Sequence, residues 1–141
     1  MGFEWEAGFI LSSKLSASAN GAFVMNYLSD GKSLPNVPET LFNFFMNYRP
    51  MNSSLLFLHW RRVGKMFIDI SNTEAGMIDS YGIWNIGAQY RWKGLDVMLK
   101  VNNIFDKLYS TYGYGYEYNG YHAYYWPGAT RNTFISLSYS F

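Results

Sequence analysis

The last eleven residues of the chain, RNTFISLSYSF at positions 131–141, alternate strictly between two kinds of side chain and end on an aromatic residue. Successive side chains of a β-strand point to opposite faces, so Thr133, Ile135, Leu137, Tyr139 and Phe141 share one face. The opposite face is mostly polar. This pattern predicts a strand of a two-faced antiparallel sheet, in either a soluble β-sandwich or the wall of a membrane barrel.

Six further segments show the same alternation of apolar and polar residues. They are residues 3–11, 15–27, 42–49, 56–61, 84–92 and 95–102. These segments approach the length that a tilted strand needs to cross a bilayer, roughly 9 to 11 residues. We therefore predict an all-β fold of about seven antiparallel strands that forms a segment of a transmembrane β-barrel.

The connections between these segments alternate in length. Short connections occupy residues 12–14, 50–53 and 93–94, and long ones occupy residues 28–38, 67–80 and 104–130. Outer-membrane barrels sort their connections in this way, with tight periplasmic turns and longer extracellular loops. The alternative of a soluble sandwich or lectin is less favoured, because so continuous an apolar face is an association liability in water.

Composition supports a membrane protein that crosses the bilayer with strands. Aromatic residues make up 21% of the 141 residues and charged residues only 15%. No apolar run reaches the roughly 20 residues of a transmembrane helix. The formal net charge of +1 gives no electrostatic reason to expect nucleic acid as a partner, and the absence of cysteine excludes disulfides and cysteine-based metal sites within the chain.

Four short motifs follow one another along the chain. They are LPNVP at 34–38, RVGK at 62–65, NNIFDK at 102–107 followed by Tyr109, and PGA at 127–129 followed by Arg131. In this order, and with a terminal Phe141, they closely resemble the carboxy-terminal part of TonB-dependent receptors. The resemblance extends over essentially the whole chain.

The resemblance implies a barrel of about 22 strands around an amino-terminal plug, in the outer membrane of a Gram-negative bacterium. Such a protein imports a scarce nutrient such as a ferric siderophore, haem, cobalamin or a glycan, with energy from the TonB complex. Residues 1–141 would form the carboxy-terminal third of the barrel domain, without the plug and the earlier strands. We expect no enzymatic activity and no cofactor, and a passive porin or structural barrel remains the alternative.

An open sheet of seven strands leaves two rows of unpaired backbone groups in hydrocarbon, at several kcal/mol for each unsatisfied group. We therefore expect residues 3–11 and 131–141 to be seam strands, paired with strands of a companion polypeptide that also supplies the plug. If the last strand descends to the periplasm, Met1 lies at the extracellular end. The first residues lack the basic and apolar regions of an export signal, so we expect an exported protein that has lost its start or is represented only in part.

The last long loop is the predicted contact region for the substrate. Tyrosine rings spaced by Gly113, Gly115 and Gly120 offer rigid contact area to flat or multi-ring ligands. The candidate substrate-binding residues are Tyr112, Tyr114, Tyr116, Tyr118, Tyr121, His122, Tyr124 and Trp126. Alternatively, these rings pack against one another or extend a strand pair.

The remaining polar and aromatic residues have structural interpretations. We predict no metal site, because His59 and His122 are isolated from other ligand-type residues, and no catalytic group, because no nucleophile lies beside a base. Residues predicted to face the barrel lumen are Glu4, Glu6, Asn43, Asn47, Arg49, Arg61, Gln89, Arg91, Asp96 and Lys100. Residues predicted to form interfacial girdles are Trp5, Tyr48, Trp60, Trp84, Tyr90, Trp92, Tyr139 and Phe141.

Overall fold

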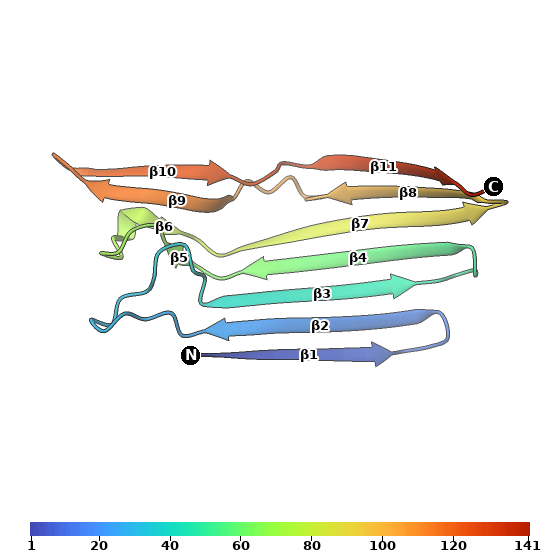
Figure 1. Cartoon of the computed structure of the whole chain (residues 1–141), viewed down its shortest axis with the longest axis horizontal. Helices are drawn as coiled ribbons and strands as arrows, with labels where there is room; N and C mark the ends of the chain where they lie inside the picture. The colour runs from blue at the N-terminus through green and yellow to red at the C-terminus, as the bar shows by residue number, and fades with distance from the viewer.

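The computed structural model describes all residues, 1–141, and its main element is one antiparallel sheet of seven strands in the order β1-β2-β3-β4-β7-β8-β11 (Figure 1). The strands are β1 (Gly2–Ile10), β2 (Leu15–Val24), β3 (Thr40–Tyr48), β4 (Ser54–Val63), β7 (Tyr81–Trp92), β8 (Leu95–Asn102) and β11 (Asn132–Tyr139). They coincide with the seven alternating segments, so the predicted strands are confirmed. The predicted seam strands, β1 and β11, are the two edges of this sheet.

Smaller elements lie within two of the long connections. They are β5 (Met66–Phe67) paired with β6 (Met77–Ile78), the 3-10 turn η1 (Glu74–Gly76), and the hairpin of β9 (Ser110–Glu117) and β10 (Tyr121–Pro127). No helix in the chain combines the length and hydropathy needed to cross a membrane. Residues 104–130, predicted as a long loop, contain the β9/β10 strand pair. A strand pair in this segment was the alternative interpretation of its tyrosines.

The connections are sorted by length between the two ends of the sheet, as predicted. Figure 1 shows the tight turns at the right, which we call the short-turn end, and the long connections at the left, the long-loop end. The tightest turn is Lys93–Gly94, where both residues have positive φ angles of 44° and 83°. Such angles close a two-residue hairpin whose twist matches the strands, and glycine adopts them without strain.

The register of the strand pairs assigns every side chain to one of two faces. Ala19 pairs with Ala7 and Phe44, and Phe44 pairs with Trp60, so these residues form one row on the apolar face. Directly paired side chains share a face. The parallel row on the other, polar face runs from Glu6 through Asn20, Asn43 and Arg61. The residues predicted to face the lumen all have the parity of this polar face.

The apolar face is not covered by any other part of the chain. Only 14 of the 141 residues are buried, and large side chains in the middle of the apolar face are open, with Ile86, Leu99 and Ile135 exposed by 42%, 44% and 64%. A soluble sandwich would cover such a face with a second sheet. An uncovered apolar face of this extent instead suits contact with lipid.

Aromatic rings mark both ends of the apolar face. At the long-loop end, the rings of Trp5, Phe42, Trp60 and Trp84 form a row across five strands, with centroids 5.8, 5.2 and 5.4 Å apart. The Trp5 ring lies over Gly21 of β2, which leaves room for the contact with Phe42. At the short-turn end, the predicted girdle residues include Trp92, which lies eight positions after Trp84 on β7. At about 3.3 Å per residue the two tryptophans are roughly 26 Å apart along the strand, close to the height of the apolar band of a membrane barrel.

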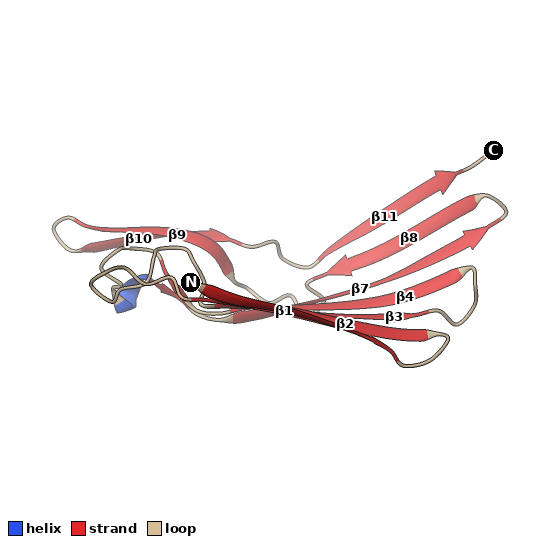
Figure 2. Cartoon of the chain, turned by 60° about the horizontal axis from the view of Figure 1, so that its bottom comes forward, coloured by secondary structure: helices blue, strands red, loops and turns tan.

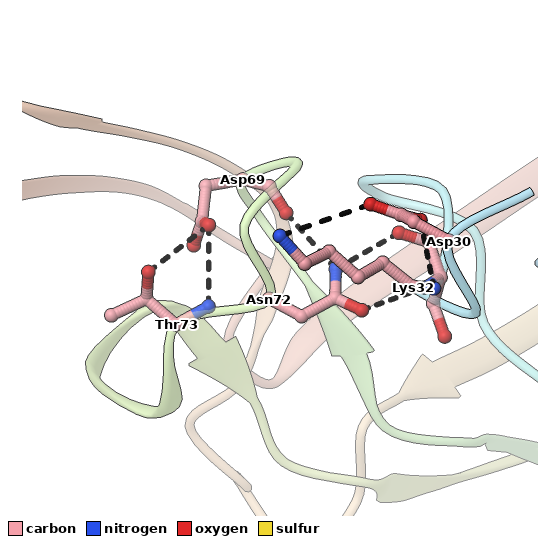
Figure 3. Close-up of polar contacts among 6 residues, drawn as sticks. Asp30, Lys32, Asp69, Asn72 and Thr73 are labelled. Carbon is pink, nitrogen blue, oxygen red and sulfur yellow. Dashed lines mark hydrogen bonds and ion pairs between the residues drawn. The ribbon is translucent and has the colours of Figure 1, made fainter. Parts of the chain in front are cut away.

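The three long connections bind one another instead of extending separately. Asn36 and Gly113 exchange two hydrogen bonds of 2.9 Å, one from the Asn36 side-chain amide and one from the Gly113 backbone N–H. In the second tie, the side chain of Asn72, labelled in Figure 3, accepts from the Ser33 N–H at 2.6 Å, and its amide donates to the Ser33 carbonyl at 2.9 Å. These bonds join the β2–β3, β4–β7 and β8–β11 connections into one unit, which we call the loop assembly.

Asp69 is the polar centre of the loop assembly. It is 8% exposed and accepts hydrogen bonds from the backbone N–H and hydroxyl of Thr73 at 3.2 and 3.1 Å. Its second oxygen accepts from the Tyr121 hydroxyl at 2.7 Å. Beside it, Met66, Ile68 and Ile78 form a small buried apolar cluster. The chain's most buried side chains thus include those of the connections, while much of the sheet remains open.

The contact between Gly87 and Phe57 predicts a sensitive position in the sheet. These residues are paired across β7 and β4, and a Cβ added at Gly87 would collide with the Phe57 ring. We expect Gly87→Val to destabilise the folded barrel by about 1–3 kcal/mol through overpacking. Gly8→Val is the matched control, because nothing lies within 4 Å of a Cβ added there. The measurement is the midpoint of the heat-dependent gel shift of the receptor that carries this chain; equal midpoints for both variants would contradict the expectation.

The Tyr121–Asp69 bond predicts an effect of alkaline pH on the loop assembly. Burial and the hydrogen bond to Asp69 raise the pKa of Tyr121 above its ordinary value. The packed state disfavours the ionised phenol. The neutral Tyr121 side chain therefore stabilises the loop assembly fully below about pH 10, and this stabilisation is lost as the pH rises above that value. We expect the β9/β10 hairpin to separate from the other connections in this range, measured as an increased distance between spin labels at Asn119→Cys and Asp30→Cys. Tyr121→Phe should remove the pH dependence; an unchanged profile in that variant would assign the transition to another group.

Candidate functional site

The β9/β10 hairpin has two chemically different faces. Tyr112 pairs with Trp126, Tyr114 with Tyr124, and Tyr116 with His122. Because paired side chains share a face, six aromatic residues of the hairpin lie on one side of it. We call this side the ring face; its members are Tyr112, Tyr114, Tyr116, His122, Tyr124 and Trp126.

The rings of this face contact one another and remain open to solvent. The Tyr116 ring stacks on the rings of His122 and Tyr124, with centroids 5.2 and 6.4 Å apart. Tyr112 meets Trp126 edge to face at 5.2 Å. The four tyrosines and the tryptophan are between 37% and 55% exposed. The ring face therefore offers a continuous aromatic surface without a lysine, arginine, aspartate or glutamate, and with hydroxyls at the tips of its tyrosine rings.

The opposite face of the hairpin combines small residues with Tyr121 and Tyr125. Gly113, Gly115 and Ala123 lie there, and Ile68 packs against the two glycines. A Cβ at Gly113 would collide with Ile68, and one at Gly115 would collide with the Tyr121 ring. The alternation of tyrosine and glycine thus serves two purposes. The glycines admit Ile68 of the β4–β7 connection on one side, and the tyrosines form the ring face on the other.

The structure brings together six of the eight predicted site residues. Tyr118 lies in the turn of the hairpin, 70% exposed. Tyr121 lies on the small-residue face, where its hydroxyl binds Asp69. Tyr118 and Tyr121 were predicted together with the other six residues as one set of candidates. The period of two between Tyr112, Tyr114 and Tyr116 is the signal that could have distinguished the residues of the ring face from Tyr118 and Tyr121.

A hollow of about 810 Å³ lies on the polar face at the long-loop end. Its floor comes from the sheet, through His59, Arg61 and Lys100. Its walls come from the connections, through residues such as Tyr109 and Thr111. We call this space the lumen hollow.

The ring face and the lumen hollow lie on opposite sides of the hairpin. Thr111 lines the hollow and has the parity of Gly113 and Gly115, which pack against the loop assembly. The rings therefore point away from the hollow. In Figure 2 the hairpin is set at an angle to β8 and β11, from which it continues at the long-loop end.

A row of side-chain hydrogen bonds crosses the polar face below the hollow. The Asn43 amide donates to the Asn20 oxygen at 3.0 Å, and the Asn43 oxygen lies 3.3 Å from His59 Nε2. The Asn85 amide lies 3.3 Å from His59 Nδ1, and the Asn85 oxygen accepts from the Asn103 backbone N–H at 3.0 Å. These partners assign the proton of a neutral His59 to Nε2. We call this row the amide ladder.

Asp96 is paired with two neighbours on the polar face near the short-turn end. Asp96 accepts from the Arg91 guanidinium at 2.9 Å and from the Gln89 amide at 2.8 Å. No group of three or more His, Asp or Glu side chains comes together anywhere in the chain. The polar groups present are therefore arranged for hydrogen bonding and ion pairing.

Comparison with known proteins gives matches to one family. The family model described as TonB dependent receptor-like, beta-barrel matches residues 1–104. The ferric yersiniabactin uptake receptor FyuA from Yersinia pestis has a TM-score of 0.82 at 20% identity, over 99% of this chain and 23% of that one. The siderophore receptor PiuA from Acinetobacter baumannii has a TM-score of 0.78 at 21% identity, over 98% and 21%.

The copper transporter OprC has a TM-score of 0.77 at 21% identity, over 98% of this chain and 23% of that one. This chain thus spans about a fifth of the length of the solved structures that it matches. None of the curated proteins compared with it matches. At these identities the solved structures support the fold, and the family model, which covers more than half of the chain, supports the membership. The chain belongs to the family of TonB-dependent receptor-like β-barrels.

Proposed function

We propose that this chain forms part of the wall of an active transporter in the outer membrane of a Gram-negative bacterium. The transporter imports a scarce nutrient such as a ferric siderophore, haem, cobalamin or a glycan. The observation that carries this proposal is a sheet with one uncovered apolar face and one polar face, in a chain that matches the receptor barrel model over residues 1–104. Two of the similar structures are named as siderophore receptors or uptake receptors and one as a copper transporter, which supports an active importer.

The proposal requires further strands and a plug. Both edges of the sheet, β1 and β11, have a free row of backbone groups, which hydrocarbon does not tolerate. A companion polypeptide, or a further part of the same one, supplies the strands that pair with these edges and the plug within the barrel. The TonB complex acts on that plug, and outer-membrane lipid covers the apolar face.

We also propose that the ring face contacts the substrate on the extracellular side. Its six residues offer rigid rings with polar tips, which contribute contact area at low conformational cost. Tyr118 at the hairpin turn adds one further exposed ring. Tyr121 has a different role, since it holds the hairpin on Asp69 and thereby fixes the direction of the ring face.

Energy dependence distinguishes this function from a passive porin or structural barrel. We expect uptake of the transported nutrient to stop when the proton gradient is collapsed or the TonB complex is removed, while binding at the cell surface persists. The measurement is accumulation of the labelled nutrient in cells with and without an uncoupler. Accumulation at an unchanged rate without the gradient would establish a passive pore.

The ring face predicts a loss of substrate binding when several of its rings are removed together. We expect simultaneous replacement of Tyr112, Tyr114 and Tyr116 by alanine to weaken binding about tenfold or more, at roughly 0.5–1.5 kcal/mol for each aromatic contact. Tyr27→Ala is the control, because Tyr27 is an exposed tyrosine of the β2–β3 connection, outside the ring face. Binding of the nutrient to the purified receptor is measured by titration. Unchanged affinity in a correctly assembled triple variant would leave these rings a structural role only.

A further inference from the structure

The chain contains two asparagine–glycine pairs, Asn20–Gly21 and Asn119–Gly120. Such a pair is chemically reactive, because the backbone nitrogen of glycine approaches the preceding asparagine side chain without hindrance from a side chain of its own. The nitrogen attacks the carbon of the side-chain amide and closes a cyclic imide. Whether this happens in a folded protein depends on how firmly the structure holds the backbone and the side chain of each pair.

The surroundings of Asn20–Gly21 oppose this attack. Both residues belong to β2, which pairs with β1 on one side and with β3 on the other. A Cβ added at Gly21 would lie 2.7 Å from Trp5 Nε1 and 3.1 Å from the Leu41 carbonyl oxygen, so the backbone is enclosed here. The Asn20 oxygen also accepts a hydrogen bond from the Asn43 amide at 3.0 Å. The sheet therefore restrains both the side chain and the backbone of this pair.

The surroundings of Asn119–Gly120 are open. The pair lies in the turn between β9 and β10, and Figure 1 shows this turn at the far left, beyond the other connections. Both residues are exposed, and nothing lies within 4 Å of a Cβ added at Gly120. The Gly120 N–H donates to no backbone carbonyl. Since exposed loop tips also open more readily than strands, the nitrogen of Gly120 is free to attack.

An aspartate–glycine pair in another connection is exposed but restrained. Asp30–Gly31 lies in the β2–β3 connection. The Gly31 N–H donates to the Leu28 carbonyl at 3.0 Å, and the Asp30 carboxylate accepts from the Lys32 N–H at 3.1 Å. The nitrogen and the side chain of this pair are thus both engaged, and a carboxylate is a poorer target for attack than an amide. Exposure together with an unengaged nitrogen therefore distinguishes Asn119–Gly120 from the other two pairs.

We infer that Asn119 is a site of covalent modification, at which its side-chain amide is converted to a carboxylate. The Gly120 nitrogen loses its proton and bonds to the side-chain carbon of Asn119, and the bond from that carbon to Nδ2 breaks with loss of ammonia. Water then opens the cyclic imide at either carbonyl. One opening gives aspartate, and the other gives isoaspartate, in which the main chain runs through the former side chain. The reaction consumes only water and changes no oxidation state.

The modification changes the hairpin that carries the ring face. A carboxylate in the turn adds a negative charge close to Glu117, the last residue of β9. Isoaspartate also lengthens the main chain of the turn, where the Tyr118 N–H donates to the Gly120 carbonyl at 2.9 Å and His122 Nε2 lies 2.8 Å from the Tyr118 carbonyl oxygen. The receptor therefore acquires with age a second form of the hairpin, with a more negative tip and altered contacts beside the ring face.

The test is peptide mapping of the purified receptor that carries this chain, after incubation at mildly alkaline pH in water enriched in heavy oxygen. Trypsin cleaves after lysine and arginine and releases residues 108–131, in which Asn119 is the only side-chain amide. It also releases residues 15–32, which contain Asn20–Gly21. Digestion in ordinary water ensures that only conversion during the incubation is labelled. We expect residues 108–131 to gain a labelled carboxylate and to separate into aspartate and isoaspartate forms, while residues 15–32 gain no label.

The same receptor unfolded in denaturant is the control, and the time at which both asparagine–glycine pairs have converted in it sets the incubation time. Asn119→Asp provides the reference for the aspartate form, since aspartate also tolerates the φ of 49° at this position. An Asn119 that persists in the folded receptor would overturn the inference, and so would equal conversion of Asn20 and Asn119 there. The mapping involves neither a nutrient nor a proton gradient, so either of these results leaves the proposed function intact.

Discussion

The backbone hydrogen bonds between the seven antiparallel strands fix the direction of every side chain in the sheet. A slip of one residue in any strand would move its apolar residues to the polar face and its charges into contact with lipid. The observed register avoids this across all six pairings, from β1 with β2 to β8 with β11. The aromatic rows, the amide ladder and the lumen hollow all depend on it. Each consists of residues that lie far apart in the sequence and that the register places side by side.

The loop assembly depends on a different constraint, which is the conformation of a few polar residues. Asn36 has a φ of 59°, in the left-handed region that asparagine tolerates better than most residues. Its side chain then reaches both backbone groups of Gly113, 77 residues away. Asn72, with a φ of 55°, bonds to Ser33 in a similar way. Two asparagines in unusual conformations therefore hold connections that the sheet alone would leave apart.

The strands and their faces could be predicted because alternation is a local property of the sequence. Trp5, Trp60 and Trp84 were placed in a girdle from their positions alone, and the structure brings them into one row with Phe42. The hairpin at 110–127 could not be separated from a loop by its sequence, since glycine and tyrosine are common in both. The different position of Tyr121 depends on its contact with Asp69, 52 residues away, which no local pattern records.

The two edge strands have a consequence for any barrel built on this sheet. Seven antiparallel strands give β1 and β11 the same direction, as their arrows in Figure 1 show. The strand that pairs antiparallel with β1 and the strand that pairs antiparallel with β11 must therefore both run opposite to these two edges. The completing strands of a fully antiparallel barrel are consequently odd in number, and the polypeptide that supplies them in unbroken succession enters on one side of the membrane and leaves on the other.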